Sequence, residues 1–299
     1  MTPDPLSPVG LLVRALLFGG ILAATGAVAF HFFVIRPLSR RDDHAAQVAL
    51  RLSRRAAAVG TAGAVAVVLM ALARLKLQAQ AMSDPALGMS VDYRLLILET
   101  TWGRAWIAQL FFAGLFLAAR NRWPLSALAA FGLAFTPAFS GHAIGSERLT
   151  ALAVAADGLH VLGAGGWLGA MLVLAMVLLI PRHAGDHTLA VAMIAAFSPL
   201  ALSAAATVTV SGALSGLLHV GSLEALTGSR YGRTLLVKVG LVIAVVFLGA
   251  FNWKRAGPRV IQHNDERPML RSIRAELGVG LLVLLATAPL VVTPPPGEE

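Results

Sequence analysis

The chain has 299 residues, of which 57% are hydrophobic and 13% charged, and its mean hydropathy is +0.76. Soluble proteins average about 45–50% apolar and about 25% charged residues, so this composition indicates an integral membrane protein. The length accommodates about eight spans of about 20 residues and requires no separate soluble domain. We therefore expect an all-α polytopic membrane bundle in which residues 1–299 form one transmembrane domain, with a disordered tail over about 293–299.

The net charge of +9 and the absence of cysteine limit the partners and the kinds of site that the protein can have. A strongly basic soluble protein would suggest a nucleic-acid partner, but here the arginines and lysines lie mainly between apolar runs, where they set membrane topology. We therefore expect membrane lipids and no nucleic acid around this chain. Without cysteine, disulfides, thiolate metal sites and cysteine nucleophiles are excluded, and soft metal ligands are limited to the eight methionines.

The first half of the chain contains four apolar runs. The first continues from Leu11 to about Ile35, and no lysine or arginine precedes it, so we expect a retained span rather than a cleaved signal peptide. The next three are expected at about 56–73, 102–119 and 124–135. Because proline lacks the N–H that continues a helix, we expect Pro137 to end the fourth span.

Four more apolar runs follow. The fifth, from about Leu149 to Ile180, is rich in glycine. The sixth, about 189–218, is longer than one bilayer crossing, and Pro199 within it predicts a kink or an interfacial first half. The last two are expected at about 235–251 and 276–292.

The distribution of lysine and arginine predicts which side each connection faces. One alternating set of connections holds 15 of these residues, and the other set, with both termini, holds 8. Connections rich in lysine and arginine usually remain in the cytoplasm, so both termini are predicted outside. The cytoplasmic set comprises residues 35–55, 119–124, 181–188 and 253–274.

The fifth apolar run carries two ionisable residues, Asp157 and His160. At 100° per residue they share one helix face with Trp167 and Met171. Hydrocarbon offers no partner to an ionisable group, so such residues in a membrane helix indicate function. The spacing Gly165-x-x-x-Gly169 lets another helix approach closely, and we expect the polar face to look into the bundle.

Three histidines converge on the predicted outer face: His142, His160 and His219. His219 ends a polar stripe on the sixth run, in which a hydroxyl residue recurs at every fourth position: Ser203, Thr207, Ser211 and Ser215. Imidazole suits copper, zinc, iron and nickel, so the three histidines predict a metal site. Asp157 is expected either as a further ligand or as the acceptor that orients the imidazole of His160.

Each of these residues also has a simpler interpretation. Any one histidine is also explained as a hydrogen-bonded polar residue, and the hydroxyl stripe is explained more simply as a helix–helix contact. Asp157 is also explained as a charge at a helix N-terminus or as a partner of Arg148. Two further residues are candidate stations on a pathway. Met171 lies about 16 Å along the helix from His160, with plain packing as its simpler role, and His31 lies near the inner end of the first span.

Short motifs in the chain resemble the copper resistance membrane protein family CopD/PcoD. They are Ser140-Gly141-His142-Ala143, Asp157-x-x-His160 and Gly165-Gly166-Trp167-Leu168-Gly169, with Thr101-Trp102-Gly103-Arg104 resembling a further family element. The resemblance covers most of the chain, including the plan of eight spans. It implies a multi-pass bacterial inner-membrane protein that imports copper from the periplasm to the cytoplasm, beside a small periplasmic copper-binding partner of the CopC type.

Two other functions remain open at this point. Histidines on adjacent helices are also ligands for a b-type haem, which would make the protein a membrane redox protein. Alternatively, the histidines serve a metal- or pH-sensing membrane subunit without transport. No P-loop, nucleophile elbow or pair of catalytic carboxylates is recognisable, so we expect no enzyme activity, and the sequence leaves the copper valence open.

Overall fold

The computed structural model describes residues 6–83, 91–120, 122–140, 150–178, 187–220, 223–251, 254 and 267–293. Every regular element in these ranges is a helix, so the predicted all-α class is confirmed. Among the described residues, six helices are long and apolar enough to cross a membrane, and they begin in α1, α3, α7, α9, α11 and α13. The polytopic membrane bundle is thereby confirmed, while the number of eight spans and the outward termini stay predictions.

The elements of the first half are α1 (Pro8–Phe30), the π-helix η1 (His31–Ile35), α2 (Arg36–Leu38), α3 (Asp43–Met82), α4 (Tyr93–Leu98), α5 (Thr101–Ala118) and α6 (Trp123–Phe139). Those of the second half are α7 (Thr150–Ala164), the π-helix η4 (Gly165–Gly169), α8 (Ala170–Leu178), α9 (His187–Val220), α10 (Leu223–Gly228), α11 (Arg230–Phe251) and α13 (Arg267–Leu290).

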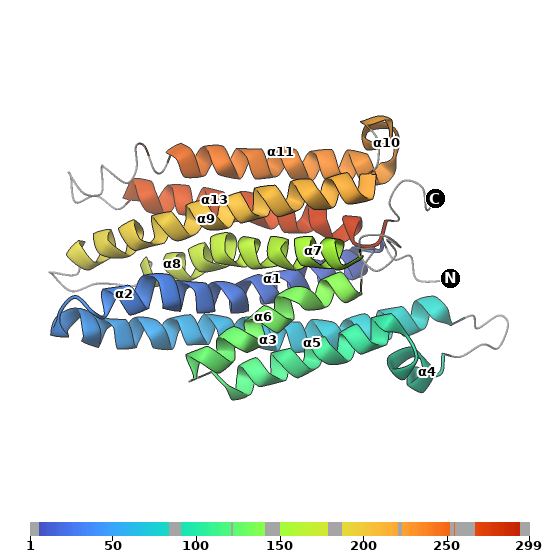
Figure 1. Cartoon of the computed structure of the whole chain (residues 1–299), viewed down its shortest axis with the longest axis horizontal. Coiled ribbons are helices and arrows are strands. Elements are labelled where there is room, and N and C mark those ends of the chain that lie inside the picture. Colours follow the sequence, from blue (N-terminus) through green and yellow to red (C-terminus); the bar gives the residue numbers. More distant parts are fainter. Residues whose placement is uncertain are drawn as a thin grey trace.

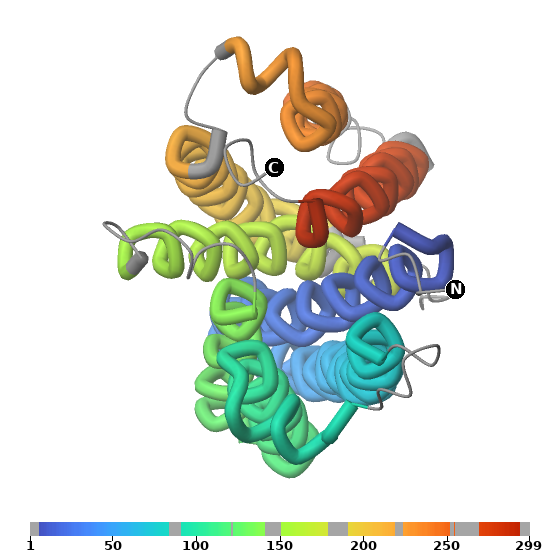
Figure 2. The backbone as a smooth tube through the Cα atoms, turned by 90° about the vertical axis from the view of Figure 1, so that its right-hand side faces the viewer, coloured from blue at the N-terminus to red at the C-terminus, as the bar shows by residue number. Residues whose placement is uncertain are grey.

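The long helices lie side by side in one bundle (Figure 1). Seen along the bundle, α1 and the continuous helix α7–η4–α8 occupy the middle, with α3, α5 and α6 on one side and α9, α11 and α13 on the other (Figure 2). Accordingly, α1 contacts α3 and η4, and α7 contacts α6 and α9. The two halves of the chain form two sides of the molecule and meet along α1 and α7.

Glycines let the two middle helices touch. A Cβ atom at Gly169 would overlap the carbonyl oxygen of Leu22, and one at Gly26 would overlap the backbone of Gly169. Gly165 lies against the side chain of Thr25 in the same way. The expectation that this glycine spacing admits a neighbouring helix is therefore confirmed, and the neighbour is α1.

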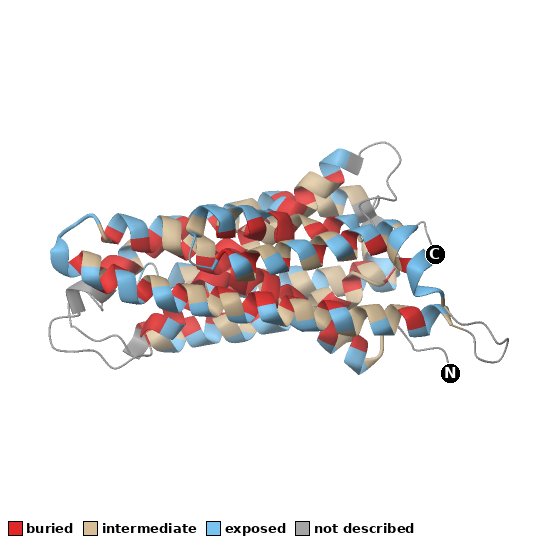
Figure 3. Cartoon of the chain, turned by 90° about the horizontal axis from the view of Figure 1, so that it is seen from below, coloured by how far each residue is buried: buried red, intermediate tan, exposed pale blue. Residues whose placement is uncertain are grey.

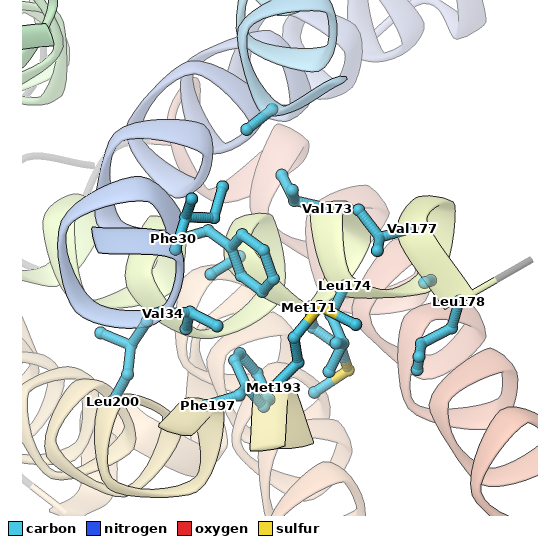
Figure 4. Close-up of a cluster of buried hydrophobic side chains, with 14 of the residues drawn as sticks. Phe30, Val34, Met171, Val173, Leu174, Val177, Leu178, Met193, Phe197 and Leu200 are labelled. Atoms are coloured by element: carbon cyan, nitrogen blue, oxygen red, sulfur yellow. The ribbon is translucent and has the colours of Figure 1, made fainter. Parts of the chain in front are cut away.

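Buried residues gather along the middle of the bundle, and the outward faces of the helices are exposed (Figure 3). The largest apolar cluster of the described residues joins the last turn of α1 and η1 to α8 and α9, with Phe30, Met171 and Phe197 among its members (Figure 4). In the most apolar window of each span, 72% of the residues of the first are buried against 6% for α11. α11 is thus the most peripheral of the candidate spans.

The prediction that Pro137 ends α6 is wrong, because the helix continues to Phe139. Proline leaves the carbonyl oxygen four residues earlier, that of Leu133, without its usual N–H donor. The hydroxyl of Thr136 donates to this oxygen at 2.9 Å. This local replacement, only two residues before the helix end, explains why the proline is tolerated there.

The arginine-rich stretch before the second predicted span is helical as well. The carboxylate of Asp42 accepts a hydrogen bond from the backbone N–H of Ala45 at 2.7 Å and caps α3 at its start. α3 therefore begins at Asp43, well before the apolar run that was predicted to begin near residue 56. The apolar run sets the membrane-crossing part of this helix, and the cap sets its beginning.

The helix ends fall into two groups at the two ends of the bundle. The start of α1 lies at the same end as α4, α10 and the last turns of α3, α6, α9 and α13 (Figure 1). This arrangement agrees with the two alternating sets of connections used in the charge count. Which end faces the cytoplasm stays a prediction.

Candidate metal centre

His160 is held against the backbone of α9. Its Nδ1 atom lies 3.1 Å from the carbonyl oxygen of Val208 and 3.4 Å from the hydroxyl oxygen of Ser211. Because a carbonyl oxygen can only accept, Nδ1 carries the proton and donates it. The Nε2 atom of a neutral imidazole then keeps its lone pair, which is the state in which histidine binds a metal ion.

Gly212 makes room for this imidazole. A Cβ atom at position 212 would lie 2.9 Å from Cε1 and 3.1 Å from Nδ1 of His160. Any larger residue would push the ring away from the carbonyl of Val208. Gly212 does not stand out in the sequence, because a glycine in an apolar helix gives no sign of what faces it.

Asp157 lies one helical turn from His160 on the same face of α7. Its Oδ1 atom accepts a hydrogen bond from the hydroxyl of Ser215 at 2.7 Å. Ser211 and Ser215 of the hydroxyl stripe therefore contact the two ionisable residues of α7. Ser203 and Thr207, in contrast, donate to carbonyl oxygens of their own helix. We call this line of contacts, from Asp157–Ser215 to His160–Val208, the α7–α9 seam.

A small cavity of about 40 Å³ opens beside the seam. His160 and Lys238 supply its polar groups, and Trp167 and apolar side chains of α9, α11 and α13 form the rest of its wall. A cavity needs roughly 10–15 Å³ of such space to hold one water molecule, so this one is large enough for a water molecule or a small ion. His160 and Trp167 thus share a face, as their spacing predicted.

Lys238 is the functional candidate that the sequence analysis missed. The count of lysines and arginines assigned it to the end of the connection 218–238, whereas it lies inside α11, beyond the first two turns of that helix. It interacts electrostatically with both His160 and Asp157, and Tyr231 on the same helix also interacts with Asp157. The signal was available, because a lysine flanked by apolar residues is as costly in a membrane as an aspartate.

His219 stands farther along the seam than His160. It lies seven residues beyond Gly212 in the continuous helix α9, or about 10 Å at 1.5 Å per residue. Its neighbour Leu218 packs with Ala153, which precedes His160 by seven residues. The side chain of His219 and all of His142 lie outside the described residues, so a shared metal site of the three histidines stays a prediction.

The two predicted pathway residues lie away from the cavity. Met171 packs in the apolar cluster with Phe30 and Met193 (Figure 4), because the π-helix η4 shifts the register of α8 relative to α7. His31 begins η1, at the end of the bundle where α2 lies (Figure 1). Its ring stacks on Trp123 with 3.8 Å between the ring centroids.

No three His, Asp or Glu side chains cluster in the described part of the chain.

The N-terminal half carries a second polar cluster, next to the motif Ser140-Gly141-His142. Arg74 on α3 donates a hydrogen bond to the hydroxyl of Ser140 at 3.3 Å, and its guanidinium lies 5.4 Å from the ring centre of Trp102. One turn below Ser140, Thr136 accepts a hydrogen bond from the side-chain amide of Gln109 at 3.2 Å. The beginning of the predicted histidine motif is thereby tied to α3 and α5.

Comparison with known proteins identifies the class. The family model of the N-terminal domain of copper resistance protein D-like proteins matches residues 5–152, and that of copper resistance protein D matches residues 191–290. The chain therefore belongs to the copper resistance protein D family, as its motifs suggested. The family is one of copper resistance and transport proteins in the membrane.

Two relatives align along nearly the whole chain. Copper transport protein CutJ of Bacillus subtilis (strain 168) is 29% identical over 312 residues, which cover 98% of this chain but 54% of CutJ. This chain thus spans about half the length of CutJ. Copper resistance protein D of Pseudomonas syringae pv. tomato is 27% identical over 314 residues, with 94% of each chain covered. No solved structure shows significant similarity to the chain.

Proposed function

We propose that the protein imports copper ions across the bacterial inner membrane, from the periplasm to the cytoplasm, along the α7–α9 seam. The observation that supports this most directly is the state of His160. Its Nδ1 proton is committed to the carbonyl of Val208, so Nε2 is left as a metal-binding nitrogen on a ring that lines a cavity. Imidazole is a common ligand of copper.

Candidate ligands are spaced along the seam rather than gathered at one depth. His219 stands nearest the end of α9, Asp157 lies next to Ser215, and His160 lies deepest. Transport favours such spacing, because an ion must bind well enough to enter but weakly enough at each place to move on. In this proposal the three residues bind copper in turn, and His142 completes the outermost site.

Acidic residues at the same end of the bundle support capture from outside. Asp92 caps α4, Glu99 follows it, and Glu224 lies in α10. Both α4 and α10 lie at the end of the bundle where α9 finishes (Figure 1). Their negative charge would raise the local concentration of copper cations, or of a periplasmic copper-binding partner of the CopC type that delivers them.

Copper uptake into proteoliposomes tests the proposal. Copper that accumulates in the lumen with the wild type, and falls close to the level of empty vesicles with His160→Ala, is the expected result. His44→Ala is the matched control, because His44 is an exposed histidine of α3 and its loss should leave uptake unchanged. Copper that binds stoichiometrically but never reaches the lumen, as Cu(I) or as Cu(II), would end the transport proposal.

The names of the family and of both relatives concern copper, and none concerns haem. The haem alternative therefore gains no support from them. An optical spectrum of the purified protein separates the two functions, since a b-type haem absorbs strongly in the visible region and bound Cu(I) does not.

A further inference from the structure

Lys238 places a positive charge beside the proposed copper path. Its side chain is half-buried, lines the same cavity as His160, and interacts electrostatically with Asp157. We propose that the Lys238 ammonium is a tethered cation that neutralises Asp157 while the seam is empty and that copper displaces on binding. This inference rests on the proposed function, because it concerns the same seam.

The Lys238 ammonium lies at the α7–α9 seam, although α11 itself lies at the periphery of the bundle. The backbone of α11 packs mainly on α13 and α10. α11 faces α7 across the cavity, which Lys238 lines from α11 and His160 from α7. The four-carbon stem of lysine suits this reach. Tyr231 lies seven residues before Lys238, two turns along the same face of α11, and it too interacts with Asp157. One face of α11 is thus directed at the polar residues of α7.

The charges of Lys238 and Asp157 explain how the pair would respond to copper. A lone carboxylate or a lone ammonium is costly within a membrane, whereas the two together are nearly neutral. A copper ion that reaches Asp157 or His160 meets the ammonium charge at close range, where repulsion in a low dielectric is strong. The ammonium must therefore swing away as copper enters. Only the position of the side chain changes in this step.

Two consequences follow for transport. Competition with the ammonium weakens copper binding, and the return of the ammonium to Asp157 favours release of the ion. A transporter needs both, since a site that binds its ion too tightly retains it. Lys238 would thus set the balance between affinity and turnover without contacting the metal.

The test compares charge removal with charge retention. Lys238→Met and Lys238→Gln remove the ammonium, and Lys238→Arg keeps a positive charge on a side chain of similar length. Binding is measured on the purified protein by competition for Cu(I) with a chelating dye, and uptake is measured in proteoliposomes. Either neutral variant should bind copper at least about tenfold more tightly than the wild type, as expected for loss of a nearby like charge. Its KM and its maximal uptake rate should both fall.

The arginine variant should stay close to the wild type in both measurements. A merely structural role for Lys238 predicts weaker binding, or a lower maximal rate at unchanged affinity, in the neutral variants. Either of those results, in a variant that remains monodisperse in detergent, would overturn the inference and leave the copper path intact. A wild-type protein that binds no copper would overturn the proposed function, and the inference with it.

Discussion

Ser215 on α9 donates a hydrogen bond to the carboxylate of Asp157 on α7 at 2.7 Å. This contact joins two helices that are far apart in the sequence. Along α7 this contact lies one turn from the one between His160 and Val208, so each ionisable residue of α7 has a partner on α9. Together the two contacts define the depth of α9 against α7. They also allow the site to be tested from the side of α9, without changing a proposed ligand.

Gly212→Val should displace the imidazole of His160, because a side chain at this position meets the ring at 2.9–3.1 Å. Copper affinity should fall by about tenfold or more, as when the groups that orient a metal ligand are lost. Gly216→Val is the control, since a Cβ atom there has nothing within 4 Å. Titration of both purified variants with Cu(I) measures the difference. Equal affinities would show that the position of His160 against α9 is unimportant for binding.

Ser215→Ala removes a hydrogen bond to a carboxylate, an interaction worth about 1.5–3 kcal/mol when the carboxylate is charged. The melting temperature in detergent should therefore fall by several degrees. Ser203→Ala should have little effect, because the hydroxyl of Ser203 is exposed and donates only within its own helix. If the two variants melt at the same temperature, the contact with Asp157 contributes nothing to stability.

Lys238 and Asp157 should be coupled in the metal-free protein. Asp157→Asn alone leaves the ammonium without its counter-charge, and Lys238→Met alone does the same to the carboxylate, so each should lower the melting temperature. In the double variant the combined loss should be clearly smaller than the sum of the single losses. Strict additivity would mean that the two charges do not interact.

Gly26→Val should abolish folding of the bundle, since a side chain there overlaps the backbone of Gly169 on the other middle helix. Gly114→Val introduces the same residue where nothing lies within 4 Å, and it should be tolerated. The yield of monodisperse protein after detergent extraction reports the outcome. A normal yield for the Gly26 variant would contradict close packing of α1 on η4.

A reporter fused after Glu299 tests the predicted topology. With both termini outside, an enzyme that is active only in the periplasm should work there, and one that is active only in the cytoplasm should not. The opposite result would invert the charge-based sidedness, and with it the direction in which the seam opens.

The sequence alone was enough to find residues that stand out within a single helix, either because they are costly in a membrane or because they are unusually small. Asp157 and His160 were found because ionisable groups are rare in apolar runs, and the glycine pair of η4 because its spacing is typical of close helix contacts. Which residues of α9 lie opposite Asp157 and His160 of α7 could not be predicted. Periodicity gives the face of a helix but not its position along a neighbouring helix. Gly212 was missed for that reason.

Other differences have local causes. Pro137 was expected to end α6, but the hydroxyl of Thr136 takes over the freed carbonyl. Lys238 was counted with the connection 218–238, although the apolar run predicted from about residue 235 already includes it, and α11 begins still earlier, at Arg230. A residue near a predicted boundary is thus easily given the wrong environment, and here that error concealed the positive charge beside the site.

The π-helix η4 lets the two halves of one span, α7 and α8, pack against different neighbours. Removing a single residue from Gly165–Gly169 would restore the regular repeat and turn everything before it by about 100° relative to everything after it. Either Asp157 and His160 would leave the seam, or Met171 would leave the apolar cluster. The one extra residue in this π-helix is therefore enough to direct the polar half and the apolar half of the span at different neighbours.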